Sequence, residues 1–196
     1  MRNPELTKKL IVEKAMPLFN LKGYRATSLS DITKVTGMTK GAIYGNFENK
    51  DAVAVATFES AVEIVISQLR SRIKSEPTAP LKLKAILNYY SGYIIDPPIK
   101  GGCPLINTAI EADDNYPMLR TKVVRVMALI KDTLKKITLR GIKEGQIIPN
   151  IDVDEFAGSF YASIKGAILI SRVEGDMDTF NLVKKGLENQ INKISK

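Results

Sequence analysis

Apolar residues recur three or four positions apart along almost the whole chain, the spacing that places side chains on one face of an α-helix. Glycine, proline and helix-capping residues interrupt these patterns at intervals, as helix ends require. We therefore expect an all-α chain of about nine helices, lying near residues 10–22, 28–37, 39–47, 49–75, 80–94, 105–113, 117–141, 152–174 and 178–194.

Two of the long predicted helices carry continuous apolar stripes, which we expect to face the core. The first stripe comprises Val55, Phe58, Val62, Ile66, Leu69 and Ile73. The second comprises Leu119, Val123, Val126, Ile130, Thr133 and Ile137. Pro17 lies inside the first predicted helix and is expected to bend it, and Gly23 is expected to end that helix.

The most informative segment is residues 27–50, where two short helices follow one another across a tight turn. Ser28 is suited to cap the first, with Asp31 as its capping-box partner, and Gly37 suits the left-handed residue that ends it. Thr39 is suited to cap the second. The residues expected to pack the pair against the first helix are Ile32, Val35, Met38, Ile43 and Phe47. This is helix-turn-helix geometry, although a plain helical hairpin would satisfy the same pattern.

The side chains that such a motif turns outward suit contact with DNA. The second helix enters the major groove by its N-terminal end, where polar and basic side chains contact phosphates and base edges. Small residues there let the backbone approach, and a methyl group can contact that of thymine. The predicted DNA-binding residues are Thr27, Ser28, Thr39, Lys40, Gly41, Ala42, Tyr44, Asn46 and Lys50.

Basic charge is concentrated in the same part of the chain. The 196 residues carry a formal net charge of +8, and residues 1–50 hold nine Lys or Arg against four Asp or Glu. An excess of positive charge in one region favours a polyanionic partner such as double-stranded DNA.

The residue inventory excludes several catalytic and metal-binding chemistries. The chain has no histidine and a single cysteine, Cys103, which excludes His-dependent catalysis, an internal disulfide and a Cys-rich zinc site. We find no glycine-rich phosphate loop. We therefore expect a protein that is not an enzyme and holds no cofactor or metal. The absence of a signal peptide or an apolar run of about 20 residues predicts a cytoplasmic protein with no membrane partner.

Residues 7–53 closely resemble the TetR family of bacterial repressors. The shared motif comprises Thr27-Ser28, Asp31-Ile32, Gly37-Met38, Thr39-Lys40-Gly41, Ile43-Tyr44, Phe47 and Asn49-Lys50. The sequence departs from the usual pattern at Asn46, where His is common, and at Ala52, where Leu is common.

The resemblance implies a sequence-specific transcriptional regulator, usually a repressor that a small-molecule effector or an oxidative signal releases from a palindromic operator. It implies a three-helix DNA-binding domain over residues 1–48 and a helical bundle for effector binding and dimerisation over residues 49–196. In a two-fold homodimer the recognition helices would contact half-sites about 34–36 Å apart.

The family resemblance also assigns roles in the second domain. The last two helices would form the dimer interface through Phe156, Phe160, Ser163, Ile164, Ala167, Phe180, Val183, Leu187 and Ile191. An effector pocket among the fifth to eighth helices would be lined by Tyr89, Tyr93, Cys103, Thr108, Met118, Met127 and Phe160. Any of these residues would serve equally as ordinary core, and no sequence feature identifies the effector.

Cys103 has two interpretations. It precedes a predicted helix, whose N-terminal dipole would lower the thiol pKa, and the surrounding Gly-Cys-Pro stretch is similar to one in some TetR-like regulators that sense oxidants or electrophiles. The alternative is a small buried apolar residue.

Two other function classes remain to be weighed against a repressor. An all-helical enzyme lacks a catalytic constellation in this sequence. A helical scaffold that dimerises without DNA leaves the basic N-terminal quarter and the Thr39–Tyr44 surface unexplained. Salt-dependent DNA binding separates both from a repressor.

Overall fold

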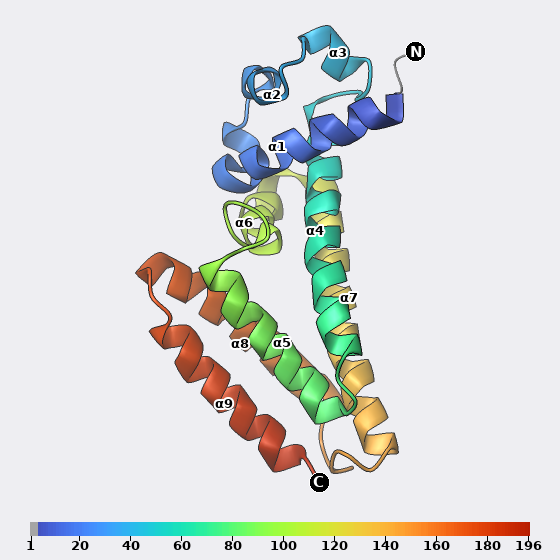
Figure 1. Ribbon diagram of the computed structural model, residues 1–196, viewed down its shortest axis with the longest axis vertical. Coiled ribbons are helices and arrows are strands. Elements are labelled where there is room, and N and C mark those ends of the chain that lie inside the picture. The colour runs from blue at the N-terminus through green and yellow to red at the C-terminus, as the bar shows by residue number, and fades with distance from the viewer. Residues whose placement is uncertain (1–3) are drawn as a thin grey trace. The chain divides into compact units, whose positions relative to one another are not determined.

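The computed structural model describes the backbone of residues 4–196 and, within them, the side chains of all but residues 113–115. Nine α-helices occupy this range and no strand does, as the sequence predicts; the one β-bridge joins Ile147 to Ser195. The helices are α1 Pro4–Ala26, α2 Leu29–Thr36, α3 Lys40–Tyr44, α4 Lys50–Lys74, α5 Ala79–Ile95, α6 Pro104–Asn115, α7 Pro117–Lys143, α8 Val153–Glu174 and α9 Asp178–Ile194 (Figure 1).

The chain divides into two compact units. One comprises residues up to 65 together with 97–125, and the other comprises residues 66–96 together with 126–196. Helices α4 and α7 each contribute residues to both units. The first unit thus contains α6 as well as the predicted DNA-binding domain, because side chains of α6 bind the C-terminal end of α1.

The first unit has a small apolar core beneath the two short helices. Its fully buried members come from α1, α2, α3 and α4: Ile11, Ala15, Ile32, Ile43 and Val53. Leu18, Phe19, Leu29, Met38 and Phe47 pack around them. Of the five residues predicted to pack the helix pair, four therefore belong to this core, and Val35 is exposed instead.

The second unit is built on α5, α8 and α9, which pack against one another (Figure 1). Capping residues determine where α8 begins and ends. The Asp152 side chain accepts hydrogen bonds from the N–H groups of Asp154 and Glu155 at its start, and Gly175 ends the helix in the left-handed conformation. Among the largest fully buried side chains of this unit are Tyr90, Phe160, Phe180, Leu87 and Ile191.

This packing corrects the predicted dimer interface. Seven of its nine residues lie in the chain's own core: Phe156, Phe160, Ile164, Ala167, Phe180, Leu187 and Ile191. Ser163 and Val183 are half-buried. The apolar stripes of α8 and α9 pack against helices of their own chain. The buried residues of these stripes are therefore not available to a second copy.

Helix α4 is long and apolar enough to cross a membrane by length and composition alone, in contrast to the sequence-based expectation. It buries Val53, Phe58, Val65 and Leu69 against the rest of the chain, as the core helix of a globular protein does. The predicted stripe was wrong in part, because Val55, Val62, Ile66 and Ile73 are only half-buried. Apolar residues lie on more than one side of this helix.

Candidate nucleic-acid interface

The two short helices are defined by local hydrogen bonds, as the sequence predicts. Ser28 and Asp31 form a complete capping box at the start of α2, and Gly37 ends that helix with φ 68°. The Thr39 hydroxyl caps α3 by accepting a hydrogen bond from the N–H of Ala42 at 3.2 Å. Because Gly37 and Met38 form the whole turn, α2 and α3 take the arrangement of a helix-turn-helix.

The capping box lowers the pKa of the Asp31 carboxyl. Hydrogen bonds from the backbone and hydroxyl of Ser28, and an ion pair with Lys22 at 2.9 Å, hold the pKa of the Asp31 carboxyl well below its usual range. The ionised carboxylate therefore stabilises the start of α2 at neutral pH, where it also complements the helix dipole.

The outward face of α3 consists of polar and small residues and has no acidic side chain. Thr39, Lys40 and Gly41 are exposed, and the Tyr44 side chain is 47% exposed. Ala42 is half-buried, and only Ile43 of this helix points into the core. A short helix with hydroxyl, ammonium and phenol groups on one side presents the donors that phosphates and base edges accept.

Three of the predicted DNA-binding residues have internal roles instead. Thr27 is fully buried, and its hydroxyl donates to the carbonyl of Gly23 at 2.6 Å, so the prediction that it contacts DNA is wrong. The Lys50 ammonium donates to the carbonyls of Tyr24 and Thr27 at 3.0 and 2.9 Å. The Asn46 side-chain amide donates to the carbonyl of Ala42 at 2.8 Å and closes the end of α3.

A cluster around Tyr24 connects the end of α1 to the start of α4. The Tyr24 hydroxyl donates to the Asp51 carboxylate, and the Lys50 ammonium lies 4.2 Å from the centre of the Tyr24 ring. Burial, and next the hydrogen bond to Asp51, raise the pKa of the Tyr24 phenol well above its usual value. The phenol therefore stays protonated and keeps donating at every physiological pH.

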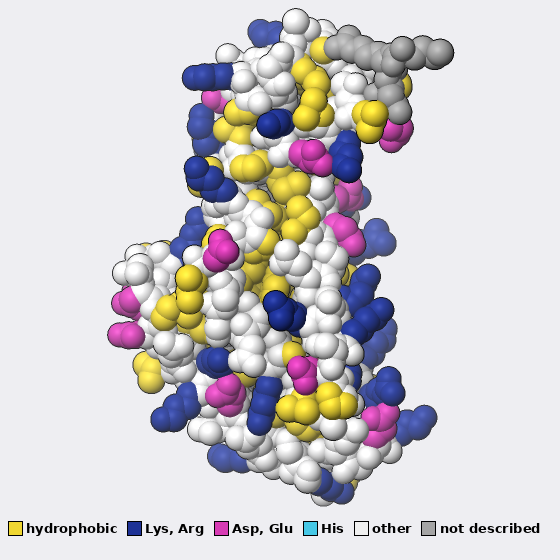
Figure 2. Space-filling model, in the orientation of Figure 1, with side chains coloured by type: hydrophobic (Ala, Val, Ile, Leu, Met, Phe, Trp, Pro, Cys, Tyr) yellow, Lys and Arg dark blue, Asp and Glu magenta, His cyan; other side chains and the backbone are white. Residues whose placement is uncertain are grey.

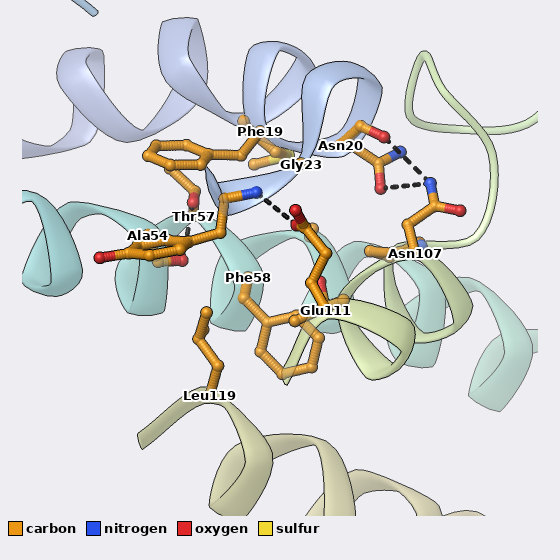
Figure 3. A pocket seen from close by; sticks show the side chains of 14 residues that line it. Phe19, Asn20, Gly23, Ala54, Thr57, Phe58, Asn107, Glu111 and Leu119 are labelled. Atoms are coloured by element: carbon orange, nitrogen blue, oxygen red, sulfur yellow. Dashed lines mark hydrogen bonds between the residues drawn. The ribbon is translucent and has the colours of Figure 1, made fainter. Parts of the chain in front are cut away.

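Glu111 of α6 binds the backbone where α1 breaks. Gly23 has φ 81° and ψ 171°, a conformation essentially restricted to glycine, and this break leaves the following N–H groups without helical acceptors. The Glu111 carboxylate accepts hydrogen bonds from the N–H groups of Tyr24 at 2.5 Å and Arg25 at 3.3 Å. Figure 3 shows Glu111 reaching from α6 towards this backbone.

A second set of contacts binds the loop before α6 to α1. The Asn20 amide donates to the carbonyls of Lys100 and Gly102 at 3.1 and 2.8 Å. The Asn107 amide donates to the Asn20 backbone carbonyl at 3.0 Å and to its side-chain oxygen at 3.1 Å (Figure 3). Gly101, at φ 104°, lies so close that a Cβ would stand 2.8 Å from the Asn20 carbonyl oxygen.

These contacts enclose a small cavity of about 30 Å³ in the first unit. Phe19, Gly23, Phe58 and Leu119 line it together with Asn107, Thr108 and Glu111 (Figure 3). It has room for one or two water molecules and not for an organic effector.

The structure distributes the predicted effector-pocket residues between the two units. Thr108 lines the small cavity of the first unit, where Met118 is 58% exposed. Tyr89, Tyr93, Met127 and Phe160 belong to the second unit, in which Tyr93 and Phe160 are buried. Their common role in one pocket stays a prediction.

Cys103 lies at the start of α6, as predicted, but its side chain is only 3% exposed. Pro104 follows it as the first residue of the helix. Burial in apolar surroundings is typical of an inert thiol, so this position favours the interpretation as a small core residue over that of an oxidant sensor.

Sequence reasoning missed Glu111, Asn20 and Asn107 as organising residues. Their partners lie 80 or more positions away along the chain. The one sequence signal was Gly23, predicted to end α1: a glycine there requires something to satisfy the backbone beyond it.

Comparison with known proteins agrees with this architecture. A family model described as "Bacterial regulatory proteins, tetR family" matches residues 11–57, and one described as "Tetracyclin repressor-like, C-terminal domain" matches residues 79–187. The chain is 26% identical over 164 residues to the HTH-type transcriptional repressor DhaR of a Mycobacterium species, covering 84% of this chain and 81% of that protein.

Two solved structures share the fold. A TetR-family transcriptional regulator from Cytophaga hutchinsonii is 38% identical with a TM-score of 0.91, covering 100% of this chain and 98% of that one. The regulator CifR, in a cysteine mutant complexed with 26-base-pair operator DNA, is 14% identical with a TM-score of 0.82 over 95% of each chain, a likeness of fold alone.

Proposed function

The chain belongs to the TetR family of bacterial regulatory proteins and is a helix-turn-helix transcriptional regulator, and we propose that it acts as a homodimeric repressor released from a palindromic operator by a small molecule. The observation that carries the DNA-binding assignment is the outward face of α3. Thr39, which caps α3, and Lys40 and Tyr44, its first and last residues, are all exposed, and the helix has no acidic residue. Its site of action is the cytoplasm, where the operator lies.

The repressor mode is supported by two independent features. The relative DhaR is itself named a repressor, and side chains of α6 bind the end of α1, so a change in the position of α6 would also move the helix-turn-helix. An effector can release the operator only if it binds one conformation of the protein more tightly than the other. An oxidative signal at Cys103 has less support, because the thiol is buried.

A dimer interface is proposed on the outer sides of the last two helices. On α8, Leu169, Ile170 and Val173 are exposed, and on α9 Leu182 is 73% exposed. Gly166 and Gly186 lie on the same helices, and a Cβ at either would meet no atom of the chain. Exposed apolar side chains beside small residues favour close helix–helix contact with a second copy.

The test is operator binding as a function of salt. DNA fragments from a genomic library, selected by the purified protein, should yield a palindrome, and fluorescence anisotropy then gives the dissociation constant. Affinity should fall steeply with rising salt, and Lys40→Ala should lower the slope of log K against log salt by about one. Lys131→Ala, an exposed lysine of α7, is the matched control and should leave the slope unchanged. Selection of unrelated fragments, unaffected by Lys40→Ala, would contradict the assignment.

A further inference from the structure

The second unit contains an apolar groove between α4 and α7 that no role described so far explains. It has a volume of about 120 Å³ and is lined by Ile66, Leu69, Arg70, Ile73, Lys74, Ile86, Leu129, Ile130, Thr133 and Leu134. Ile66 and Ile73 belong to the α4 stripe that the sequence predicts as core, yet both are only half-buried. The groove is therefore the place where the apolar side of α4 lacks full cover from its own chain.

Its volume matches a compact apolar group. An apolar cavity of about 150 Å³ accommodates a molecule the size of benzene and does not hold water well. Apart from the Thr133 hydroxyl, which donates to the Leu129 carbonyl at 2.8 Å, and two basic residues, every lining side chain is aliphatic. Such a surface favours a ring or a short branched alkyl group over water.

The two basic residues set the charge of the occupant. Arg70 and Lys74 are four residues apart on α4, so both lie on the same side of the helix and beside the groove. Within the described part of the chain neither makes an ion pair or side-chain hydrogen bond. Two like charges at this spacing destabilise each other, and an anion placed between them would relieve that repulsion.

A neighbouring hollow provides a contrast. It shares Ile73 and Thr133 with the groove, but two of its three basic residues already pair with carboxylates, and the third, Lys82, donates to the backbone carbonyl of Glu76. Arg140 donates to Glu144 at 2.7 Å, and Lys136 pairs with Asp132 at 2.7 Å. On the face drawn in Figure 2, Lys and Arg side chains are abundant, so basic charge alone marks no site. Unpaired cations beside uncovered apolar surface distinguish the groove from this general background.

We propose that this groove binds a small amphipathic anion, with an apolar ring or short alkyl body against Ile66, Ile73 and Leu134 and a carboxylate on Arg70 and Lys74. The site names the chemical class of the effector and so rests on the proposed function. The bound molecule contacts α4, which runs without interruption from Lys50, the residue that binds the α1–α2 connection, to Lys74.

The experiment uses the full chain and isothermal titration calorimetry with three probes of one shape: 4-phenylbutyrate, 4-phenylbutan-1-ol and 4-phenylbutylamine. The carboxylate should bind at least tenfold more tightly than the alcohol or the amine, a difference of about 1.4 kcal/mol. Arg70→Gln with Lys74→Gln should remove that preference. Arg72→Gln, an exposed cation on the same helix that does not line the groove, is the control and should keep it.

A charge reversal keeps the test informative if the neutral variant binds weakly for other reasons. Arg70→Glu with Lys74→Glu should favour 4-phenylbutylamine over 4-phenylbutyrate, with unchanged circular dichroism. No saturable binding of the carboxylate to the wild type, or equal binding in the neutral variant, would overturn the proposal. So would a change in sedimentation coefficient in these variants, which would assign the groove to a second copy of the chain.

Operator binding is measured on the same preparations, so the two proposals fail separately. Loss of probe binding with intact operator binding would refute the anion site alone. Tight carboxylate binding by a protein that selects no operator would support the site and refute the repressor.

Discussion

The carboxylate of Glu111 accepts a hydrogen bond from the backbone N–H of Tyr24 at 2.5 Å, across 87 positions of sequence. This bond and its companion to the Arg25 N–H satisfy the backbone immediately after the Gly23 break. The segment that follows leads into the capping box of α2. A side chain of α6 therefore helps to fix the direction in which the chain enters the helix-turn-helix.

Removing this carboxylate should cost measurable stability. Glu111→Ala leaves the partly buried N–H of Tyr24 and the exposed N–H of Arg25 without their acceptor, and because of the partly buried group we expect the free energy of unfolding to fall by about 1–3 kcal/mol. The matched control is Glu59→Ala, which removes an exposed ion pair with Lys122 and should cost less than about 1 kcal/mol. Equal losses in chemical denaturation would contradict the role given to Glu111.

Gly23→Ala should destabilise through the backbone rather than through crowding. A Cβ at residue 23 would stand 2.5 Å from the Glu111 carboxylate, but that flexible side chain is able to move. The φ of 81° is not relieved in this way, so we expect a loss of about 1–3 kcal/mol. The loss should persist in the Glu111→Ala background. If it disappears there, contact with the carboxylate is the cause.

Lys50 and Lys40 should respond differently to substitution, because one ammonium binds backbone carbonyls and the other is exposed. Lys50→Met removes hydrogen bonds to Tyr24 and Thr27, and we expect a loss of stability of about 1.5–3 kcal/mol. At temperatures where the variant stays folded, the salt dependence of operator binding should match that of the wild type. A slope lowered by about one, as expected for Lys40→Ala, would show instead that Lys50 contacts phosphate.

The capping box should make the stability of the first unit sensitive to acid. Ionised Asp31 has its pKa lowered by Ser28 and Lys22, so its contribution is complete above the unfolded value of about 4 and is lost as the pH falls towards the folded value. Asp31→Asn should therefore lower Tm at pH 7. The gap between the two proteins should narrow below about pH 4. A gap that stays constant with pH would exclude an ionised carboxylate as its cause.

Local structure was predictable because its causes are local. The Ser28–Asp31 box, the Gly37 turn and the Thr39 cap each depend on residues within three or four positions, and the structure confirms all three. The ends of α8 follow in the same way from Asp152 and Gly175. Helix caps and tight turns require the same residue types wherever the segment packs in the folded chain, so they can be read from the local sequence.

Side-chain orientation was predicted less well, because periodicity marks an apolar face without naming its partner. Helix α4 is apolar on more than one side, so its spacing did not decide between Val65, which is buried, and Ile66, which lines a groove. The buried hydroxyl of Thr27 and the carbonyl-bound ammonium of Lys50 depend on the Gly23 break and its long-range partner. No local pattern carries that information.

The same reasoning moves the expected dimer contacts to the other side of α8 and α9. Ile164 and Leu187 are buried within one chain, whereas Val173 is 81% exposed and Leu182 is 73% exposed. Val173→Glu with Leu182→Glu should convert the dimer to a folded monomer in sedimentation velocity, because each charge would be desolvated at the interface. Operator affinity should fall with it, since two half-sites are then no longer bound by one particle.

Two controls give this prediction its force. Ile110→Glu, at a 69% exposed apolar position of α6, should leave the sedimentation coefficient unchanged, which separates a specific interface from general surface charge. Ile164→Ala should cost about 2–5 kcal/mol of stability while the folded protein stays dimeric. The opposite result, in which Ile164→Ala dissociates the dimer and the double glutamate variant does not, would contradict the prediction. The buried apolar sides of α8 and α9 would then have to separate from their own chain to reach the partner. In that case the dimer would form by exchange of these helices rather than by contact between their outer sides.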